Sequence, residues 1–269
     1  MIVAFSGTGN SFIVARLLSE GLAESDVRLL QGEALLDPQP EVGADDERII
    51  WVFPTYSWGV PPIMRRYIER CSLKGSTDAV HHLVVTCGDD VGNLAWQWSA
   101  LLKRKGWRRG GVWSVQMPNT YVCMKGFDVD PEEVETKKIE QCPERVGKIV
   151  ADISSGNFIV DVVTGRWRFF KTRVIYPWFV RFDMSPKPFK ASDKCISCGL
   201  CAQECPTLNI KMRPENDLSA RPSWDDNCSL CLRCYHNCPA KAIEYGRQTR
   251  GKGQYKVFRQ VMSEIKAKE

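Results

Sequence analysis

The 269-residue sequence contains no long hydrophobic run and no low-complexity tract. Its longest uncharged apolar stretch, Val174 to Val180, is far shorter than the roughly 18 residues that a membrane-spanning helix needs, which excludes a membrane-spanning protein. The first strand candidate starts directly after Met1 and leaves no room for an export signal. We therefore expect a cytoplasmic protein.

Two nucleotide-binding motifs are missing as well. The glycine-rich stretch SGTGNS, residues 6–11, does not match G-x4-G-K-[ST], which argues against a nucleoside triphosphate loop with bound magnesium. The sequence has no G-x-G-x-x-G unit, which argues against a dedicated dinucleotide domain. No recognition fold for nucleic acids accompanies the basic segments, so nucleic acid is not an expected partner.

Composition and charge describe a globular protein with two regions of basic excess. Hydrophobic residues make up 43% and charged residues 26% of a chain long enough for two domains. Residues 1–155 carry 17 Lys and Arg against 21 Asp and Glu, and residues 191–246 carry 6 against 7. Residues 156–190 and 247–269 each carry 7 against 2, so the basic excess lies in a predicted linker and a predicted tail.

The first 155 residues alternate between short apolar runs and amphipathic segments, as strands and helices do in a parallel sheet covered on both faces. This pattern predicts an α/β fold with a doubly wound, five-stranded parallel sheet and right-handed crossovers. The expected strands are residues 2–5, 27–30, 48–53, 83–86 and 111–116. The expected helices are residues 11–21, 61–71, 93–105 and 131–154.

Twelve cysteines without an export signal indicate metal or redox chemistry rather than disulfides. Eight of them form the pattern C-x2-C-x2-C-x3-C-P twice, starting at Cys195 and at Cys228. Three thiolates of such a loop can hold one cubane, while the fourth leaves on a diverging helix and ligates the other cluster. We therefore predict two [4Fe-4S] clusters. Cluster 1 is assigned Cys195, Cys198, Cys201 and Cys238, and cluster 2 is assigned Cys228, Cys231, Cys234 and Cys205.

Zinc is the alternative occupant of these cysteines. Structural zinc sites favour C-x2-C pairs separated by a longer loop, without a third cysteine at this spacing or a trailing proline. The doubled motif therefore favours iron–sulfur clusters, and residues 191–246 resemble bacterial two-cluster ferredoxins, which implies a small α+β domain. His236, inside the second motif, is interpreted as a solvent-facing spacer, with a supporting group behind the cluster ligands as the alternative.

The stretch SGTGNS is either a plain turn or a place where backbone amides bind an anion. It follows a strand and precedes a helix, where glycines allow close approach and the helix N-terminus offers free amides. Because no lysine is present, the remaining candidate ligand is a monophosphate held by amides and hydroxyls. The stretch resembles the phosphate loop of flavodoxins, which bind FMN. The candidate residues are Ser6, Gly7, Thr8, Gly9, Asn10 and Ser11.

Two further loops are expected beside the flavin, because ligands of this fold lie beyond the carboxyl ends of the strands. The loop PTYSWG offers Tyr56 and Trp58 to the flavin ring, and the loop TCGDDVGN offers backbone amides to the polar edge of the ring. The candidates in the first loop are Pro54, Thr55, Tyr56, Ser57, Trp58 and Gly59. The candidates in the second loop are Thr86, Cys87, Gly88, Asp89, Gly92 and Asn93.

With the further runs MPNTYV, PSW and AIEYG, the chain resembles fused flavodoxin–ferredoxin proteins of anaerobes. This resemblance implies a flavodoxin-like FMN domain at 1–155, a linker at 156–190, a two-cluster ferredoxin domain at 191–246 and a basic tail at 247–269. The tyrosine that often covers the outer face of the flavin in flavodoxins is missing. Tyr121 or an aromatic residue of the linker is the candidate for this place.

The linker interleaves basic and aromatic residues as GRWRFFKTRVIYPWFVRF. This pattern favours an inter-domain strut, with a peripheral membrane contact or a protein contact as the alternatives. Several thiols and imidazoles outside the cluster motifs are interpreted as packing groups. They are Cys71, Cys87, Cys123, Cys142, His81 and His82, with a flavin contact as the alternative for Cys87.

A flavin and two clusters together convert between two-electron and one-electron chemistry. The first hypothesis is therefore an electron-transfer flavo-iron-sulfur protein with a redox partner. The alternatives are a flavin-dependent reductase of a small oxidised substrate and a non-catalytic redox sensor. The basic linker and tail make an acidic ferredoxin a candidate partner, and a homodimer is also open.

Overall fold

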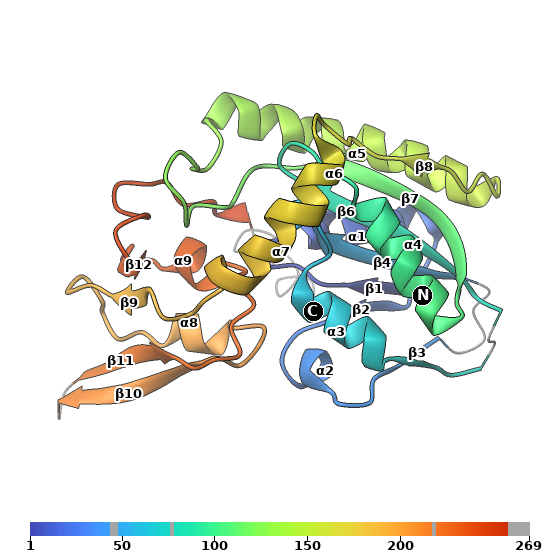
Figure 1. The fold of residues 1–269 in the computed structure, drawn as a ribbon. Coiled ribbons are helices and arrows are strands. Elements are labelled where there is room, and N and C mark those ends of the chain that lie inside the picture. The colour runs from blue at the N-terminus through green and yellow to red at the C-terminus, as the bar shows by residue number, and fades with distance from the viewer. Residues whose placement is uncertain (44–47, 76–77, 217–218, 258–269) are drawn as a thin grey trace.

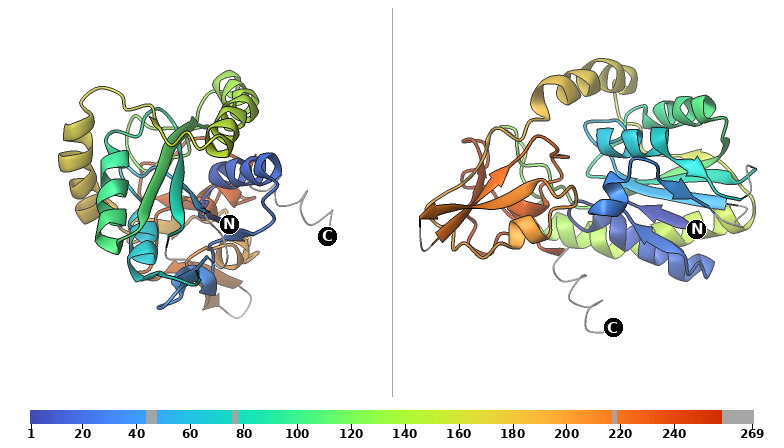
Figure 2. Two further views of the ribbon diagram at one scale, coloured as in Figure 1. Left: turned by 90° about the vertical axis from the view of Figure 1, so that its right-hand side faces the viewer. Right: turned by 90° about the horizontal axis from the view of Figure 1, so that it is seen from below.

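The computed structural model describes residues 1–43, 48–75, 78–216 and 219–257. A large unit holds a parallel sheet with helices on both faces, and a smaller unit holds short helices and antiparallel strand pairs (Figure 1). One further helix runs between them at the outer edge of the molecule (Figure 2). Within these residues no helix is both long enough and apolar enough to cross a membrane.

The sheet of the large unit confirms the predicted α/β fold. Its strands are β1 (Ile2–Ala4), β2 (Val27–Leu29), β4 (Arg48–Pro54), β6 (Val80–Cys87), β7 (Arg108–Gln116) and β8 (Val160–Asp161). They are all parallel and lie in the order β2-β1-β4-β6-β7-β8. The five predicted strands thus take the order 2-1-3-4-5 of flavodoxin-like folds, and β8 adds a short sixth strand.

Helices on both faces of the sheet bury two apolar cores. The helices are α1 (Asn10–Leu22), α2 (Glu33–Leu36), α3 (Pro62–Arg70), α4 (Leu94–Lys105) and α5 (Glu132–Ser154), and a separate strand pair is formed by β3 (Glu41–Val42) and β5 (Ser72–Leu73). Strand β6 is buried at every position, as expected for the centre of a parallel sheet. One core contains Trp51 and Trp98, and the core on the other face contains Trp113 and Ile149.

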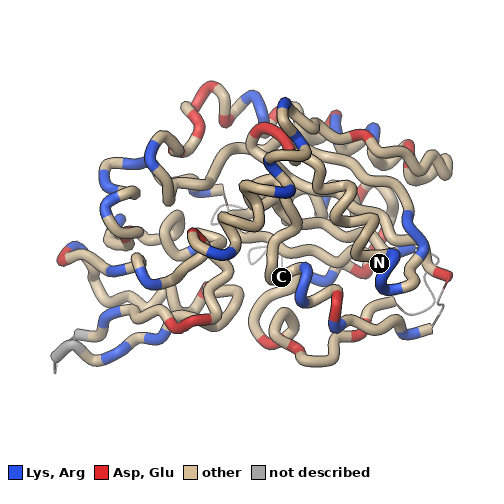
Figure 3. The backbone as a smooth tube through the Cα atoms, in the orientation of Figure 1, with Lys and Arg blue, Asp and Glu red and all other residues tan. Residues whose placement is uncertain are grey.

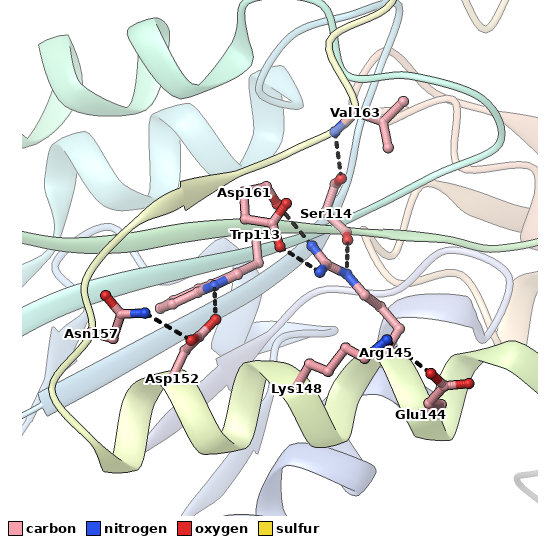
Figure 4. Close-up of polar contacts among 9 residues, drawn as sticks. All are labelled: Trp113, Ser114, Glu144, Arg145, Lys148, Asp152, Asn157, Asp161 and Val163. Atoms are coloured by element: carbon pink, nitrogen blue, oxygen red, sulfur yellow. Dashed lines mark hydrogen bonds and ion pairs between the residues drawn. The ribbon is translucent and has the colours of Figure 1, made fainter.

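Strand β8 lies inside the segment predicted as a linker and is fastened to helix α5 (Figure 4). Arg145 of α5 donates from Nε to the carbonyl of Ser114 at 2.9 Å and from Nη1 to the carboxylate of Asp161 at 2.5 Å. Trp113 donates from Nε1 to Asp152 at 3.1 Å. These long-range contacts explain why residues that look like a linker in the sequence extend the sheet.

The smaller unit is built from two short antiparallel pairs and two short helices. Its elements are β9 (Phe189–Ala191), α8 (Leu200–Gln203), β10 (Ile210–Asn216), β11 (Ser219–Trp224), α9 (Arg233–Asn237) and β12 (Ile243–Tyr245). Its core includes Phe189, Tyr235 and Ile243, and it also takes in Val122 from the large unit and Phe179 from the connecting helix. This shared core holds the two units together.

The connecting helix is continuous from residue 168 to residue 183 and contains two π-helical turns. It consists of α6 (Arg168–Phe170), η1 (Lys171–Ile175), α7 (Tyr176–Trp178) and η2 (Phe179–Asp183), and we call it the bridging helix. Thr172 on its inner face donates from Oγ1 to the carbonyl of Trp58, and the Tyr176 hydroxyl donates to the carbonyl of Val60 at 2.6 Å. The inner face of the bridging helix is thus held against the large unit.

Candidate functional site

Four cysteines from both motifs surround a first small cavity in the smaller unit, which we call cage 1. The cysteines are Cys195, Cys198, Cys201 and Cys238. The other lining side chains are apolar and include Ile196, Leu200, Met212 and Pro222. Cys198 is exposed, and Ile196 next to it keeps 65% of its surface accessible. Cage 1 is therefore apolar in lining and close to the protein surface.

The other four cysteines surround a second cavity, which we call cage 2. They are Cys205, Cys228, Cys231 and Cys234. The side chains of Ser229 and Trp224 also line this cavity. Each cage thus takes three sulfurs from one motif and the fourth from the other, which is the exchange predicted from the spacing.

The internal repeat extends from the cysteines to the backbone. Ser197 and Leu230, which are equivalent in the two motifs, both have positive φ values, of 54° and 53°. Gly199 and Leu232 are equivalent as well, with φ values of 74° and 62°. Alternation of right- and left-handed residues turns successive backbone N–H groups to one side and forms an anion-binding concavity. The two loops therefore wrap their cavities with the same geometry.

The donor chemistry of both cages fits an iron–sulfur cluster. Backbone amides donate to the cysteine sulfurs, from Ala242 to Cys238 at 3.2 Å and from Leu230 to Cys228 at 3.3 Å. Burial, with a smaller contribution from a neighbouring thiol, raises the pKa of Cys228 to about 12. Thiols of this kind become thiolates when a cationic metal centre binds them.

The spread of the sulfurs also bears on what a cage can hold. A zinc ion at about 2.3 Å from four sulfurs needs them packed around a single point. Among the described residues, no three His, Cys, Asp or Glu side chains gather tightly enough to hold a single metal ion. The eight cysteines line two small cavities, four at each.

A larger cavity of about 420 Å³ lies where the two units and the bridging helix meet. Its size is within the range of roughly 300–1,000 Å³ that is usual for cofactor sites. All three predicted flavin loops contribute to its wall. The predicted residues on the wall are Ser6, Gly7, Thr8, Asn10, Ser11, Pro54, Thr55, Tyr56, Ser57, Trp58, Thr86, Cys87, Gly88 and Asp89.

Four predicted residues do not line the cavity, and three of them contact the bridging helix instead. The backbone N–H of Asn93 donates to Thr172 Oγ1 at 2.8 Å, and a Cβ on Gly92 would lie 2.8 Å from the same atom. A Cβ on Gly59 would overlap the ring of Tyr176. The fourth, Gly9, has a φ of 106° at the start of α1. Gly9 thus allows the backbone conformation at the start of α1, and Gly59 and Gly92 leave room for the bridging helix.

The loop before helix α1 contributes polar residues to the cavity wall. The helix begins at Asn10 without a side-chain cap, so its first backbone amides are available to an anion. The amide side chain of Asn10 is already engaged, because it accepts from the Tyr255 hydroxyl at 2.6 Å and donates to Pro118 at 2.9 Å. Asn10 therefore offers its backbone amide, rather than its side chain, to an anion.

Aromatic side chains also line the cavity, and two of them come from positions of the bridging helix that the sequence did not single out individually. Trp58, Tyr121, Trp178 and Phe179 line it, so both kinds of candidate for the flavin cover, Tyr121 and a linker aromatic, belong to the cavity wall. Residues 118–120 line the wall as well, since they follow the fifth predicted strand at the same sheet edge. That position is the signal by which they could have been found.

The large cavity and cage 2 share a wall. Cys231 lines both cavities. Gly7 of the glycine-rich loop packs so closely on the cage that an added Cβ would lie 2.8 Å from the Cys231 carbonyl oxygen. Buried Arg233 donates to the carbonyls of Gly7 at 2.8 Å and Ser6 at 2.5 Å. The glycine-rich loop is thus fastened directly to the second cysteine motif.

His236 differs from the interpretation as a solvent-facing spacer. Its ring is 2% exposed and bridges three segments: Nε2 lies 2.8 Å from the Thr120 carbonyl, and Nδ1 accepts from the Tyr255 backbone at 3.0 Å. Burial lowers the pKa of His236 to about 4, so the ring stays neutral. The tertiary contacts of residues 120 and 255, which are remote in sequence, put it inside.

Several of the remaining thiols and imidazoles lie in packed surroundings. Cys71, Cys123 and Cys142 are buried in the three apolar cores, and Cys87 is buried on the wall of the large cavity. His81 accepts at Nδ1 from Trp51 Nε1 at 3.1 Å. His82 accepts at Nδ1 from the Gly111 amide at 3.2 Å. These two imidazoles hold neighbouring strands and side chains in place.

The strand order and the cysteine cages together define a class: a flavodoxin-like domain joined to a 4Fe-4S ferredoxin domain. Residues 189–211 match the family described as "4Fe-4S binding domain". The chain is also 34% identical over 85 residues to pyruvate synthase subunit PorD of Methanothermobacter marburgensis, which covers 32% of this chain and 76% of PorD. The chain therefore belongs to the family of 4Fe-4S ferredoxin proteins that includes PorD.

Two solved structures show weaker similarity. A flavodoxin of Streptococcus pneumoniae TIGR4 is 17% identical and covers 55% of this chain and 97% of its own, with a TM-score of 0.32. The FMN-dependent NADH-azoreductase of Bacillus anthracis is 11% identical and covers 55% and 98%, with a TM-score of 0.34. The fold assignment rests on the strand order and not on these scores. The presence of a flavodoxin-like domain and a 4Fe-4S domain in one chain supports a role in electron transfer.

Proposed function

We propose that the protein is an electron-transfer protein that couples FMN, bound in the large cavity, to two [4Fe-4S] clusters and a redox partner. FMN exchanges one or two electrons when bound, and each cluster exchanges one. The observation that carries the proposal is the position of Cys231, which lines both the large cavity and cage 2. Leu232 lines both cavities as well, so the two proposed cofactor sites share a wall that includes two adjacent residues.

In this proposal the protein's own residues hold and separate the cofactors. The first amides of α1 and the hydroxyls of Ser6, Thr8 and Ser11 bind the phosphate of FMN. The aromatic residues of the cavity wall, such as Trp58 and Tyr121, receive the ring. The assigned cysteines ligate the clusters, and the apolar residues between them exclude water.

The redox partner is proposed to dock beside cage 1. Cage 1 is the more exposed of the two, with Cys198 at the surface. Lys194, which precedes Cys195, and Lys241, three residues after Cys238, are exposed. A partner with an acidic surface, such as an acidic ferredoxin, would be complementary to this face.

Anaerobic purification with cofactor analysis tests the proposal. We expect about one FMN and about eight iron and eight sulfide atoms per chain. Bleaching of the flavin band together with the cluster bands on addition of reduced ferredoxin is the expected functional result. A colourless preparation that contains zinc and retains no flavin after reconstitution would refute the proposal. Steady turnover of a small acceptor, in contrast, would favour the reductase hypothesis over pure electron transfer.

A further inference from the structure

The outer face of the bridging helix carries an unusual set of exposed aromatic side chains. Its inner face is buried against the large unit, as described for Thr172 and Tyr176. Large apolar side chains recur at every fourth position on the outer face, and Trp96 of α4 lies beside them. We call this set the aromatic patch: Trp96, Trp167, Phe169, Phe170, Val174, Trp178 and Phe182, each between 48% and 75% exposed.

Basic residues are interleaved with the aromatic patch. Arg166, Arg168, Arg173 and Arg181 are all exposed, and residues 166–182 contain no acidic residue. Three of these guanidinium groups lie over patch rings, at 4.9 Å from Phe169, 4.8 Å from Trp96 and 5.5 Å from Phe182. Figure 3 shows Lys and Arg along this helix. The surface is therefore apolar and cationic at once.

We infer that the aromatic patch docks the protein on the surface of an anionic lipid membrane. Helices that lie in the membrane interface combine Trp and Phe, which enter the boundary of the acyl chains, with Arg and Lys, which meet anionic headgroups. The bridging helix presents both kinds of side chain on one face. It also lies at the outer edge of the molecule, where a flat surface can reach it (Figure 2).

Charge argues against a second copy of the chain as the occupant. A two-fold symmetric dimer through the patch would bring the four arginines of one copy toward the four arginines of the other. Anionic headgroups neutralise these charges instead. An acidic protein could do the same, but the patch is a projecting helix face with half-exposed rings, and a bilayer accommodates such rings without a matching pocket.

Vesicle flotation of the protein purified with its cofactors tests the inference. One vesicle set contains phosphatidylcholine alone, and in the other set part of it is replaced by phosphatidylglycerol. We expect at least tenfold more protein bound to the anionic vesicles, and less at high salt because screening weakens the arginine contacts. Equal binding to both sets, or no binding to either, would overturn the inference.

Matched variants assign the binding to the patch. Phe170→Ser/Phe182→Ser and Arg168→Gln/Arg173→Gln are each expected to lower binding to anionic vesicles about tenfold. Phe158→Ser and Arg108→Gln, which change exposed residues of the same types on the large unit, are expected to have no effect. Circular dichroism and iron content report whether each variant is folded, and equal losses in patch and control variants would overturn the inference.

Two other occupants of the patch are outcomes of the same experiments. Sedimentation that shows a dimer, which the patch variants dissociate, would assign the face to a second copy. Patch variants that bind vesicles normally but no longer exchange electrons with an acidic ferredoxin would assign it to a protein partner. Either result would overturn the inference.

Discussion

Cage 1 and cage 2 are formed by the same repeated loop, yet their surroundings differ. Cage 1 is lined by apolar side chains such as Met212 and Pro222 and lies near the surface. Cage 2 lies against the large unit, with Ser229 and Trp224 on its wall and the buried Arg233 next to Cys234 in the sequence. The cysteines that the two copies share therefore set the ligands, whereas positions that differ between the copies, such as Ser229 in place of Ile196 and Arg233 in place of Leu200, set the polarity.

This difference bears on reduction potential, because hydrogen bonds to sulfur and nearby charge change the potential of a cluster. The Tyr56 hydroxyl is buried and has no hydrogen-bond partner among the described residues. Burial, and to a smaller degree nearby Cys231 and Cys228, raises the pKa of Tyr56, so it stays protonated. Cage 2 thus has a proton donor nearby that the repeat did not supply to cage 1.

Removing one ligand from each cage should give the largest effect. Cys198→Ser in cage 1 and Cys231→Ser in cage 2 should each lower the iron content by about half. Only Cys231→Ser should also lower flavin retention, because Cys231 lines the flavin cavity. Iron and flavin analysis of anaerobic preparations measures both effects. Equal flavin loss in both variants would contradict the expected difference between the two cages.

Replacing the buried arginine beside cage 2 should have the next largest effect. Arg233→Leu leaves the carbonyls of Ser6 and Gly7 without their charged donor and should cost about 3 kcal/mol in the free energy of unfolding. Arg250, which pairs with Glu244 at the surface, is the control, and Arg250→Leu should cost less than about 1 kcal/mol. Anaerobic urea unfolding measures both values. Equal losses would show that the Arg233 hydrogen bonds to Ser6 and Gly7 stabilise the fold no more than a surface ion pair does.

The large unit should lose stability in mild acid through two histidines far from the cages. Burial lowers the pKa of His81 to about 4, and burial, with a smaller contribution from Arg48, lowers that of His82 to about 4. Between pH 6.5 and 4 the unfolded chain binds more protons than the folded chain, so stability falls as pH falls. From pH 7 to pH 5 the loss should be about 2 kcal/mol per histidine.

Urea unfolding followed by tryptophan fluorescence at these pH values measures that loss. His81→Gln retains an acceptor for Trp51 and does not titrate, so it should remove about half of the pH dependence. A slope unchanged by this substitution would show that other groups cause the acid sensitivity of the large unit.

Removing the donor beside cage 2 should give the smallest effect. Tyr56→Phe deletes one hydroxyl and should lower the reduction potential of cluster 2 by about 40 mV, which corresponds to about 1 kcal/mol. The potential of cluster 1 should not change. Anaerobic redox titration with spectroscopic detection resolves the two centres. A shift of the same size in both clusters would show that Tyr56 does not distinguish them.

The parts of the structure that follow from local patterns could be predicted from the sequence. Hydrophobic periodicity and turn-forming residues along the first 155 residues predicted the five main strands and four helices to within a few residues. The doubled cysteine spacing predicted two sets of four cysteines in which each motif gives its fourth cysteine to the other set. The structure gathers the same two sets around two cavities. The flavin loops follow strands whose carboxyl ends meet at one sheet edge.

Features that depend on contacts between remote segments could not be predicted in this way. Gly59 and Gly92 lie in flavin loops but make room for the bridging helix, a role that no local pattern carries. His236 is enclosed by segments 116 residues before it and 19 residues after it. Gly7 meets Cys231 from the other unit, so the glycine-rich loop has a second function that its resemblance to a phosphate loop does not reveal.

The hydrogen bond between Tyr255 and Asn10 links positions 245 residues apart. A ribosome that adds about 5–20 residues per second needs roughly 10–50 s to make the second partner after the first. During that interval the Asn10 side chain lacks the contact that fixes it in the finished protein. The loop beside the large cavity therefore reaches its final form only late in synthesis, after both cysteine motifs have been made.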